Sequence, residues 1–191
     1  ATLNFQPILN PDTVRLVIFD YNRIPYITDL AVIPATGPYV IYENSQVADL
    51  NIGNGNGQLD YAETTNLTIG IKNIGVASSE NTQVTLRTTS PFVTIVDSTE
   101  NYGSVPAGQV VAMPEGFQVM VSPQVPDKQV ISFKLIVSDT ADTWNSLFTL
   151  QAHAPVLSQG VVSVVDTNGI NNNRLDPGET VYLNVTVSNM G

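Results

Sequence analysis

An internal repeat constrains the fold of this chain more than any other feature of its sequence. Residues 59–75 read LDYAETTNLTIGIKNIG, and residues 175–191 read LDPGETVYLNVTVSNMG, at an offset of 116 positions. Seven positions are identical between the two segments. Upstream, an Asp-x-Asn sequence that begins at Asp49 recurs at Asp166, at an offset of 117 positions. Two landmarks in nearly the same register indicate two copies of one structural unit.

The period of the repeat predicts the size of that unit. About 117 residues is too long for one unit of a solenoid, which spans about 20–50 residues, and it suits an immunoglobulin-like sandwich of roughly 100 residues. We therefore expect a complete sandwich at residues 38–154 and the opening strands of a second copy at residues 155–191. Residues 1–37 are expected to be closing strands of a preceding β-sandwich domain, which makes the chain a piece of a longer, multi-domain protein.

Composition and alternation favour an all-β, antiparallel fold. Only 13% of the residues are charged, and 13 Gly and 12 Pro separate short segments rich in Val, Ile and Thr, which is typical of strands joined by turns. Leu67, Ile69 and Ile71 alternate with polar residues and are expected to face the core. In the second copy the expected inward residues are Leu183, Val185 and Val187. The predicted strands cover residues 13–20, 28–33, 39–42, 66–73, 83–88, 92–96, 108–113, 116–122, 130–138, 146–152, 160–165 and 181–189.

The charge balance and the absence of cysteine exclude several classes of function. Seven basic and 17 acidic side chains give a net charge of −10, which disfavours a nucleic-acid backbone as partner. With no Cys and one His, the chain has no disulfide framework, no thiol nucleophile and no multi-His metal site. No apolar run approaches ~18 residues, so no membrane-spanning helix is predicted.

Two polar loops, at residues 49–63 and 166–179, carry the side chains that could bind a metal ion. Each loop contains three carboxylates and several Asn residues. Ca²⁺ binds six to eight oxygen ligands, and interspersed Gly and Asn let the backbone curl so that such ligands converge. The second loop is the better candidate because it contains a Pro-Gly turn. Its expected ligands are Asp166, Asn168, Asn171, Asn173, Asp176 and Glu179, and those of the first loop are Asp49, Asn51, Asn54, Asn56, Asp60 and Glu63.

A second interpretation of these loops needs no metal. The loops lack the Glu at the twelfth position and the flanking helices of an EF-hand. Asn and Gly also satisfy the backbone geometry of long hairpin turns, where Asx hydrogen bonds hold the chain. A calcium site and an Asx-stabilised turn are therefore alternative predictions for the same residues.

Two single residues bear on other functions. His153 is the only imidazole, and without Cys or a Gly-x-Ser-x-Gly elbow it has no nucleophile to activate, so a structural or exposed histidine is expected. Trp144 is expected to be a buried core residue, whereas an exposed Trp144 would favour glycan binding. No motif marks a glycosidase pair of acids, although such acids can be distant in sequence. We predict no catalytic residue in this segment.

Several segments of the chain resemble one known family. These segments are residues 22–27 (NRIPYI), 37–40 (GPYV), 53–60 (GNGNGQLD) and 175–179 (LDPGE). Together they resemble the region downstream of the catalytic domain in gingipain-like cysteine peptidases of Gram-negative bacteria. The resemblance implies an immunoglobulin-like domain that follows a catalytic domain. It carries over no catalytic residue, because the family's catalytic Cys and His would lie before residue 1.

These observations predict a non-catalytic β-sandwich spacer and interaction module of a secreted or cell-surface peptidase, with Ca²⁺ stiffening its loops. An adhesive or glycan-binding module of a bacterial surface protein is the alternative. The expected partners are adjacent domains of the same polypeptide, other surface proteins or glycans. Because residues 1–37 and 155–191 would expose strand edges, three arrangements of these ends are open: packing against the central domain, pairing with each other, or pairing with the same segments of a second molecule in a two-fold dimer.

Overall fold

The computed structural model describes residues 12–19, 21, 24–32, 36–166 and 172–191. Every regular element in these residues is a β-strand, and they include no helix with the length and apolarity needed to cross a membrane. The strands are β1 (Asp12–Ile18), β2 (Tyr26–Val32), β3 (Val40–Ala48), β4 (Leu59–Asp60), β5 (Thr64–Asn73), β6 (Ser79–Thr88), β7 (Val93–Asp97), β8 (Thr99–Val105), β9 (Val110–Val121), β10 (Gln129–Ser138), β11 (Thr143–His153), β12 (Leu157–Val165) and β13 (Tyr182–Asn189).

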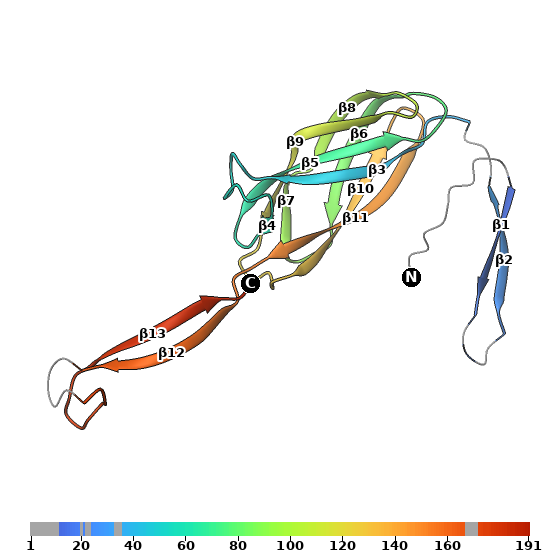
Figure 1. Cartoon of the computed structure of the whole chain (residues 1–191). Coiled ribbons are helices and arrows are strands. Elements are labelled where there is room, and N and C mark those ends of the chain that lie inside the picture. Colours follow the sequence, from blue (N-terminus) through green and yellow to red (C-terminus); the bar gives the residue numbers. More distant parts are fainter. Residues whose placement is uncertain (1–11, 20, 22–23, 33–35, 167–171) are drawn as a thin grey trace.

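Strands β3 to β11 form a sandwich of two sheets (Figure 1). One sheet has the order β3-β5-β9-β7, and the other has the order β4-β11-β10-β6-β8. When the seven strands β3, β5, β6, β7, β9, β10 and β11 are lettered A to G in chain order, the sheets become A-B-E-D and G-F-C. This is the arrangement of an immunoglobulin constant domain, with β4 and β8 added at the edges of the second sheet. The predicted all-β, immunoglobulin-like fold is confirmed.

The hydrophobic core lies between these two sheets. Leu67, Ile69 and Ile71 of β5 are fully buried, as their alternation predicts, and Phe133 and Leu135 of β10 are fully buried on the opposite sheet. Burial of such side chains is the main favourable term in the stability of a domain of this size. The core therefore depends on both sheets being present.

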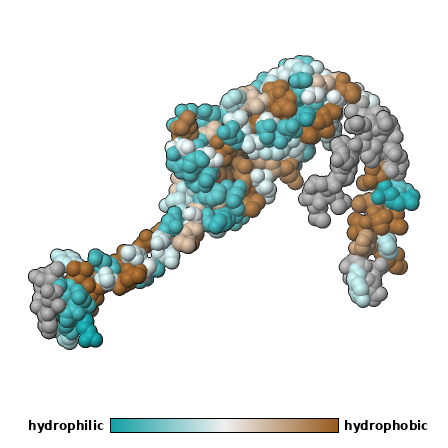
Figure 2. Space-filling model, viewed as in Figure 1, coloured by the Kyte–Doolittle hydropathy of each residue, from teal (hydrophilic) through white to brown (hydrophobic). Residues whose placement is uncertain are grey.

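The remaining four strands form two hairpins outside the sandwich, β1–β2 and β12–β13. In Figure 2 both hairpins carry apolar residues on their surfaces. Leu183, Val185 and Val187 of β13 are 57%, 50% and 59% exposed. The prediction that they face a core is wrong for the structure described, because β13 pairs only with β12 and no second sheet covers it.

The β12–β13 hairpin nevertheless reproduces the β3–β5 hairpin residue for residue. Both pairs are antiparallel, and both have a bulge at the same place, after Tyr42 and after Gln159. At offsets of 117 in the first strand and 116 in the second, the register is identical. The pairs Val40–Asn73, Tyr42–Ile71, Ser45–Ile69 and Val47–Leu67 recur as Leu157–Asn189, Gln159–Val187, Val162–Val185 and Val164–Leu183.

Each bulge contains one glycine, but on opposite strands in the two copies. In β5, a Cβ on Gly70 would collide with the side chain of Asn44 on β3. In β12, a Cβ on Gly160 would collide with the side chain of Thr186 on β13, the residue equivalent to Gly70. Each bulge therefore holds one side chain against one glycine.

An asparagine closes each hairpin at the end where the chain enters. Asn73 Oδ1 accepts the backbone N–H groups of Tyr39 at 3.0 Å and of Gly75 at 2.9 Å. In the second copy, Asn189 Oδ1 accepts the N–H groups of Val156 at 2.9 Å and of Gly191 at 3.2 Å. The repeat thus extends from residue identity to hydrogen-bond geometry.

The predicted strands differ from the structure mainly in β3, β4, β8 and β9. Strand β3 continues to Ala48, whereas the predicted strand ended at residue 42. The short strand β4 and the edge strand β8 were not predicted, and the predicted strands at residues 108–113 and 116–122 are one strand, β9. A bulge replaces the expected break: Glu115 has φ 52°, and the pairing of β9 with β5 shifts between Leu67 and Ile69. The strand therefore continues through Pro114 instead of ending there.

Candidate functional site: the two polar loops

The first polar loop joins β3 to β5, and a buried carboxylate organises its centre. Asp49 is 3% exposed. Its Oδ2 accepts the backbone N–H of Asn56 at 2.9 Å, and the N–H of Gly57 lies 3.1 Å from Oδ1 and 3.0 Å from Oδ2. Gly57 has φ 75°, a conformation that glycine adopts without strain. Both oxygens of Asp49 are therefore occupied by N–H donors.

A second buried carboxylate, Glu63, holds the other side of the loop. Glu63 Oε1 accepts the backbone N–H of Asn54 at 2.8 Å, and Oε2 accepts the N–H of Asp60 at 3.3 Å. A Cβ on Gly53 would collide with the Glu63 carboxylate, so only glycine fits at this position. The carboxylates of Asp49 and Glu63 together satisfy the backbone of a loop that has no ladder partner.

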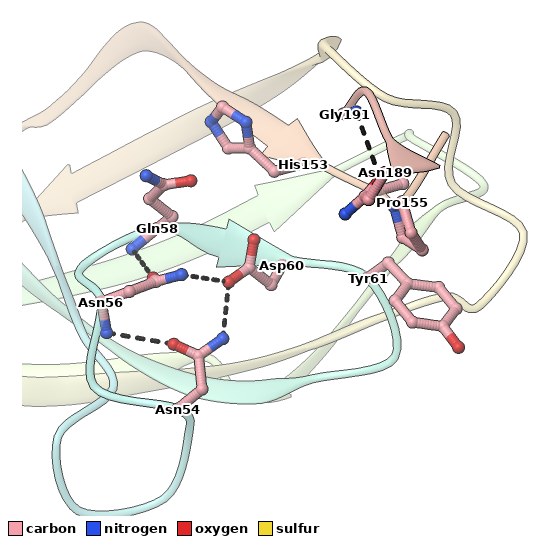
Figure 3. A pocket seen from close by; sticks show the side chains of 10 residues that line it. Asn54, Asn56, Gln58, Asp60, Tyr61, His153, Pro155, Asn189 and Gly191 are labelled. Carbon is pink, nitrogen blue, oxygen red and sulfur yellow. Dashed lines mark hydrogen bonds between the residues drawn. The ribbon is translucent and has the colours of Figure 1, made fainter. Parts of the chain in front are cut away.

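Side-chain amides converge on the third carboxylate, Asp60, as Figure 3 shows. The Nδ2 atoms of Asn54 and Asn56 donate to Asp60 Oδ2 at 2.6 Å and 2.7 Å, and Asn54 Oδ1 accepts the N–H of Asn56 at 3.0 Å. Asn51 lies apart from this network, because its Nδ2 donates to Glu115 at 3.2 Å. Five of the six predicted residues therefore lie in one network.

Hydrogen bonds to the carboxylates hold the first loop in this structure. Ca²⁺ needs oxygen atoms that are free to coordinate it, whereas the oxygens of Asp49 and Glu63 accept N–H groups and the amides of Asn54 and Asn56 donate to Asp60. Within the described part of the chain, no three His, Cys, Asp or Glu residues are grouped so as to hold a metal. The hydrogen bonds are those of an Asx-stabilised turn, and the calcium ligands named for this loop stay a prediction.

The second polar loop repeats the main hydrogen bonds of the first. Asp166 Oδ2 accepts the N–H of Asn172 at 2.9 Å, and Asn172 Nδ2 donates to Asp176 Oδ2 at 2.7 Å. Asp176 N–H donates to Glu179 Oε2 at 3.2 Å. Asn168 and Asn171 lie outside the described residues.

Asn172 is a site residue that the sequence analysis missed. It takes the place of Asn56, whereas the predicted ligands were its neighbours Asn171 and Asn173. The repeat could have identified this residue. An offset of 116 positions places Asn172 at the position of Asn56 and Asn173 at the position of Gly57. Asn173 accordingly has φ 59°, a backbone role in which Asn is the best substitute for Gly.

One atom distinguishes the two loops. Asp166 is 3% exposed, like Asp49, but its Oδ1 has no hydrogen-bond partner. In the first loop the equivalent oxygen accepts the N–H of Gly57. A buried carboxylate oxygen without a partner is costly, so Asp166 Oδ1, among the described residues of the second loop, is a buried oxygen that is available to a ligand.

A polar cavity of about 620 Å³ lies beside the first loop (Figure 3). The amides and carboxylate of the loop form one wall, and Tyr61, His153 and Asn189 contribute others. The His153 carbonyl accepts the N–H of Tyr61 at 2.8 Å, so this histidine anchors the loop through its backbone. Trp144 is 9% exposed and lies 6.4 Å from the ring of Tyr39. Its predicted burial is confirmed, and it offers no exposed platform for a sugar.

Asp127 ties the end of the sandwich to the segment that leads into β12. Its Oδ1 accepts the N–H of Ala154 at 3.2 Å, and its Oδ2 lies 3.2 Å from Lys128 Nζ. The hydrogen bond from Ala154, aided by Lys128, lowers the pKa of this carboxyl below its ordinary value of 3.8. The charged form of Asp127 is therefore favoured by the fold.

Comparisons with known proteins assign no family to this chain. No family model matches the sequence, and no curated protein matches it. Similar solved structures include native alpha-2-macroglobulin from Escherichia coli, from domain MG7 to the C-terminus (11% identity, TM-score 0.42), of which this chain spans 19% using 69% of its own length. A FixG-related protein from Vibrio parahaemolyticus is 15% identical (TM-score 0.30; 63% of this chain, 98% of that chain). The CsuC-CsuE chaperone–tip adhesion subunit complex from Acinetobacter baumannii is 13% identical (TM-score 0.28; 58% and 77%).

Proposed function

We propose that this chain is a non-catalytic, immunoglobulin-like spacer and interaction module of a secreted or cell-surface protein, built from tandem copies of one sandwich. The observation that carries the proposal is the repeat, because β12–β13 has the register, bulge and closing asparagine of β3–β5. The proposed organisation is closing strands at residues 1–37, a complete sandwich at 38–154 and opening strands of the next copy at 155–191. Units that repeat in series set distances and present surfaces.

The parent protein that we propose is a gingipain-like peptidase, whose catalytic domain would be stabilised or positioned by such modules. The support is the resemblance of the loop at residues 53–60 and of the LDPGE segment at 175–179 to that family. His153, the only imidazole of the chain, is engaged through its carbonyl in the β4 region and has no Cys to activate.

The experiment mixes the pure chain with a gingipain-like catalytic domain and measures the thermal midpoint and the activity of that domain. We expect a higher midpoint with the chain present and no peptide cleavage by the chain alone. An unchanged midpoint contradicts the stabilising role. Cleavage of a peptide panel by the chain alone, abolished in His153→Ala, contradicts the non-catalytic assignment.

We also propose that Ca²⁺ binds the second polar loop, where it would stiffen the hairpin. The support is the buried, unpartnered Oδ1 of Asp166, an oxygen of the hard type that Ca²⁺ prefers. Asp176 would supply the second carboxylate, from the other side of Asn172.

Isothermal titration with CaCl₂ tests the calcium proposal. We expect one site per chain that is lost in Asp166→Asn and retained in Asp49→Asn, the matched control in the first loop. Absence of binding at millimolar Ca²⁺, or equal loss in both variants, contradicts it. If the unmodified chain does not bind Ca²⁺, the Asx interpretation holds for both loops.

A further inference from the structure

We propose that the outer face of the five-stranded sheet binds an acidic, extended segment of a partner protein through Arg87, Lys134 and Leu147. The proposal goes beyond a spacer role, since it assigns a surface and the chemistry of its partner. It depends neither on a peptidase as the parent protein nor on calcium in the loops. The strands that form this face, β6, β8, β10 and β11, all belong to the two-sheet sandwich.

The outer face of this sheet is positively charged, although the chain is acidic. The chain has 17 acidic and 7 basic side chains. None of the acidic side chains is among the outward-facing residues of the regularly paired parts of β6, β8, β10 and β11, whereas Arg87 and Lys134 are. The outward-facing residues are Gln83, Thr85, Arg87, Thr99, Asn101, Val130, Ser132, Lys134, Ile136, Ser138, Thr143, Asn145, Leu147, Thr149 and Gln151.

Arg87 and Lys134 have no carboxylate partner among the residues that the structure describes. By contrast, Arg15, Lys72 and Lys128 each lie 2.8–3.6 Å from a carboxylate oxygen. Carboxylates do border the face, in the bulged start of β6, at the end of β7 and in the turn that joins β10 to β11, but they form no ion pair with either cation. These border residues are Glu80, Asp97, Asp139 and Asp142.

The positions of the two cations are unfavourable for the sheet alone. Arg87 and Lys134 lie directly opposite each other on the neighbouring strands β6 and β10. Cβ atoms at such positions are about 5 Å apart, and like charges there destabilise a sheet. Leu147 of β11 lies opposite Lys134 in the same row and is 78% exposed, the highest value for a large hydrophobic residue in β3 to β11. An anionic ligand with an apolar part would compensate both costs.

Two adjoining hollows give this ligand its shape. The row of Arg87, Lys134 and Leu147 lines a hollow of about 240 Å³. A second hollow of about 200 Å³, lined in part by Phe92 and Val130, shares Thr89 and Ser132 with the first. Each is smaller than the pockets of about 300–1,000 Å³ that small molecules occupy, so each suits a single side chain. Two such hollows in succession suit neighbouring side chains of an extended peptide.

The donors on this face select a carboxylate of a protein over other anions. Arg87 uses Nη1 for the carbonyl of Leu86, at 3.5 Å, which leaves further guanidinium N–H groups for a bidentate carboxylate. Two cations are too few for a lipid surface, which is recognised by clusters of four to eight basic residues, and the net charge of the chain opposes nucleic acid. No aromatic ring is among the outward-facing residues of this face, which disfavours a glycan.

Fluorescence anisotropy tests the proposal with a labelled hexapeptide of alternating Glu and Leu, titrated with the 191-residue chain up to millimolar concentration. The test variants are Arg87→Gln, Lys134→Gln and Leu147→Ser. Lys72→Gln and Lys128→Gln are matched controls, because they remove the same charge from ion-paired sites. The same peptide with Gln in place of Glu and a heparin hexasaccharide are the comparison ligands. Amide signals in nuclear magnetic resonance spectra of the labelled chain locate the bound peptide.

We expect the unmodified chain and both controls to bind the Glu-containing peptide, with shifts of the amide signals of β6, β10 and β11. Each cation variant raises the dissociation constant about tenfold or more, as the loss of a charge-assisted hydrogen bond implies, and Leu147→Ser also weakens binding. The peptide with Gln binds about tenfold more weakly. The thermal midpoint of Lys134→Gln equals or exceeds that of the unmodified chain, because the repulsion from Arg87 is removed, so its loss of binding is not a loss of folding.

Several outcomes would overturn the proposal. One is the absence of peptide binding at millimolar concentration, and another is unchanged binding in a test variant. Equal weakening in the controls would show that only net charge matters. Tighter binding of the heparin hexasaccharide than of the peptide, lost in the same variants, would assign the face to an anionic glycan. None of these outcomes bears on the repeat that supports the spacer role.

Discussion

The hairpins β3–β5 and β12–β13 share their register, their bulge and their closing asparagine. The side chains on one face of β3–β5 are nevertheless buried in a core, whereas the equivalent side chains of β12–β13 are exposed. Ile69 is fully buried, whereas its equivalent Val185 is 50% exposed. The difference comes from what lies opposite, because β5 has β9 at its second edge and a five-stranded sheet over its face. Local sequence therefore specifies the hairpin, while the remaining strands of the sandwich supply its burial.

The largest expected effect is on the core. Ile69→Ala should lower the free energy of unfolding by about 2–5 kcal/mol, because it leaves a cavity between two sheets. The equivalent change Val185→Ala should stay within about 0.5 kcal/mol, as for exposed positions. Urea unfolding followed by Trp144 fluorescence measures both. Similar losses at the two positions would show that β13 is covered in solution.

The closing asparagines should differ next. Asn73 is fully buried, and besides its two Oδ1 bonds its Nδ2 donates to the carbonyls of Ala77 at 2.8 Å and Val105 at 2.9 Å. Asn73→Ala should therefore cost about 2–4 kcal/mol, because it leaves buried groups without partners. Asn189→Ala should cost less than about 1 kcal/mol in the same denaturation experiment, since solvent replaces its bonds. Equal losses of unfolding free energy in the two variants would contradict the expected difference between the two hairpins.

The loops give a smaller difference. Asp49→Ala removes the acceptor of two backbone N–H groups beneath the first loop and should destabilise the sandwich by about 1–3 kcal/mol. Asp166→Ala should leave the unfolding transition of the sandwich unchanged, since it lies beyond β11. Differential scanning calorimetry of the two variants without Ca²⁺ measures this. A shift in the Asp166 variant would show that the second loop supports the sandwich.

The smallest expected effect is a pH dependence at the junction. The fold lowers the pKa of Asp127, so its charged form stabilises the native state above the ordinary value of 3.8, and this stabilisation is lost as the pH falls through the lowered pKa. In Asp127→Asn the dependence of the unfolding midpoint on pH below about 4 should be shallower. Thermal scans in acidic buffers test this, and a parallel shift at all pH values would assign the effect to the lost hydrogen bond alone.

The fold could be predicted because its signals are local and periodic. Alternation placed Leu67, Ile69 and Ile71 correctly, and the repeat located the hairpins. Strand β8 was missed because its sequence, TENYGSV, turns only Tyr102 and Val105 fully inward, which is too sparse a pattern to register. Strand β9 was divided because Pro114 and Gly116 usually end strands, and a bulge is settled only by the neighbouring strand.

The site could be predicted in part. The repeat correctly placed five polar residues in the first loop. Carboxylates in such a loop can bind either a metal ion or backbone N–H groups, and the conformation of the loop backbone determines which of the two they face. The five residues are Asp49, Asn54, Asn56, Asp60 and Glu63. Nothing in the sequence pattern indicates that Asp166 Oδ1 lacks a hydrogen-bond partner.

The exchanged glycines of the two bulges matter when neighbouring copies fold on one polypeptide. If β3 paired with β13 in the register of β3–β5, Asn44 would meet the side chain of Thr186 in place of Gly70, and the two side chains would compete for one space. Strand β3 thus fits β5 better than it fits β13. Arrays of similar domains are prone to such cross-pairing as they emerge from synthesis. The missing side chain at Gly70 therefore favours the pairing of β3 with β5 within one copy.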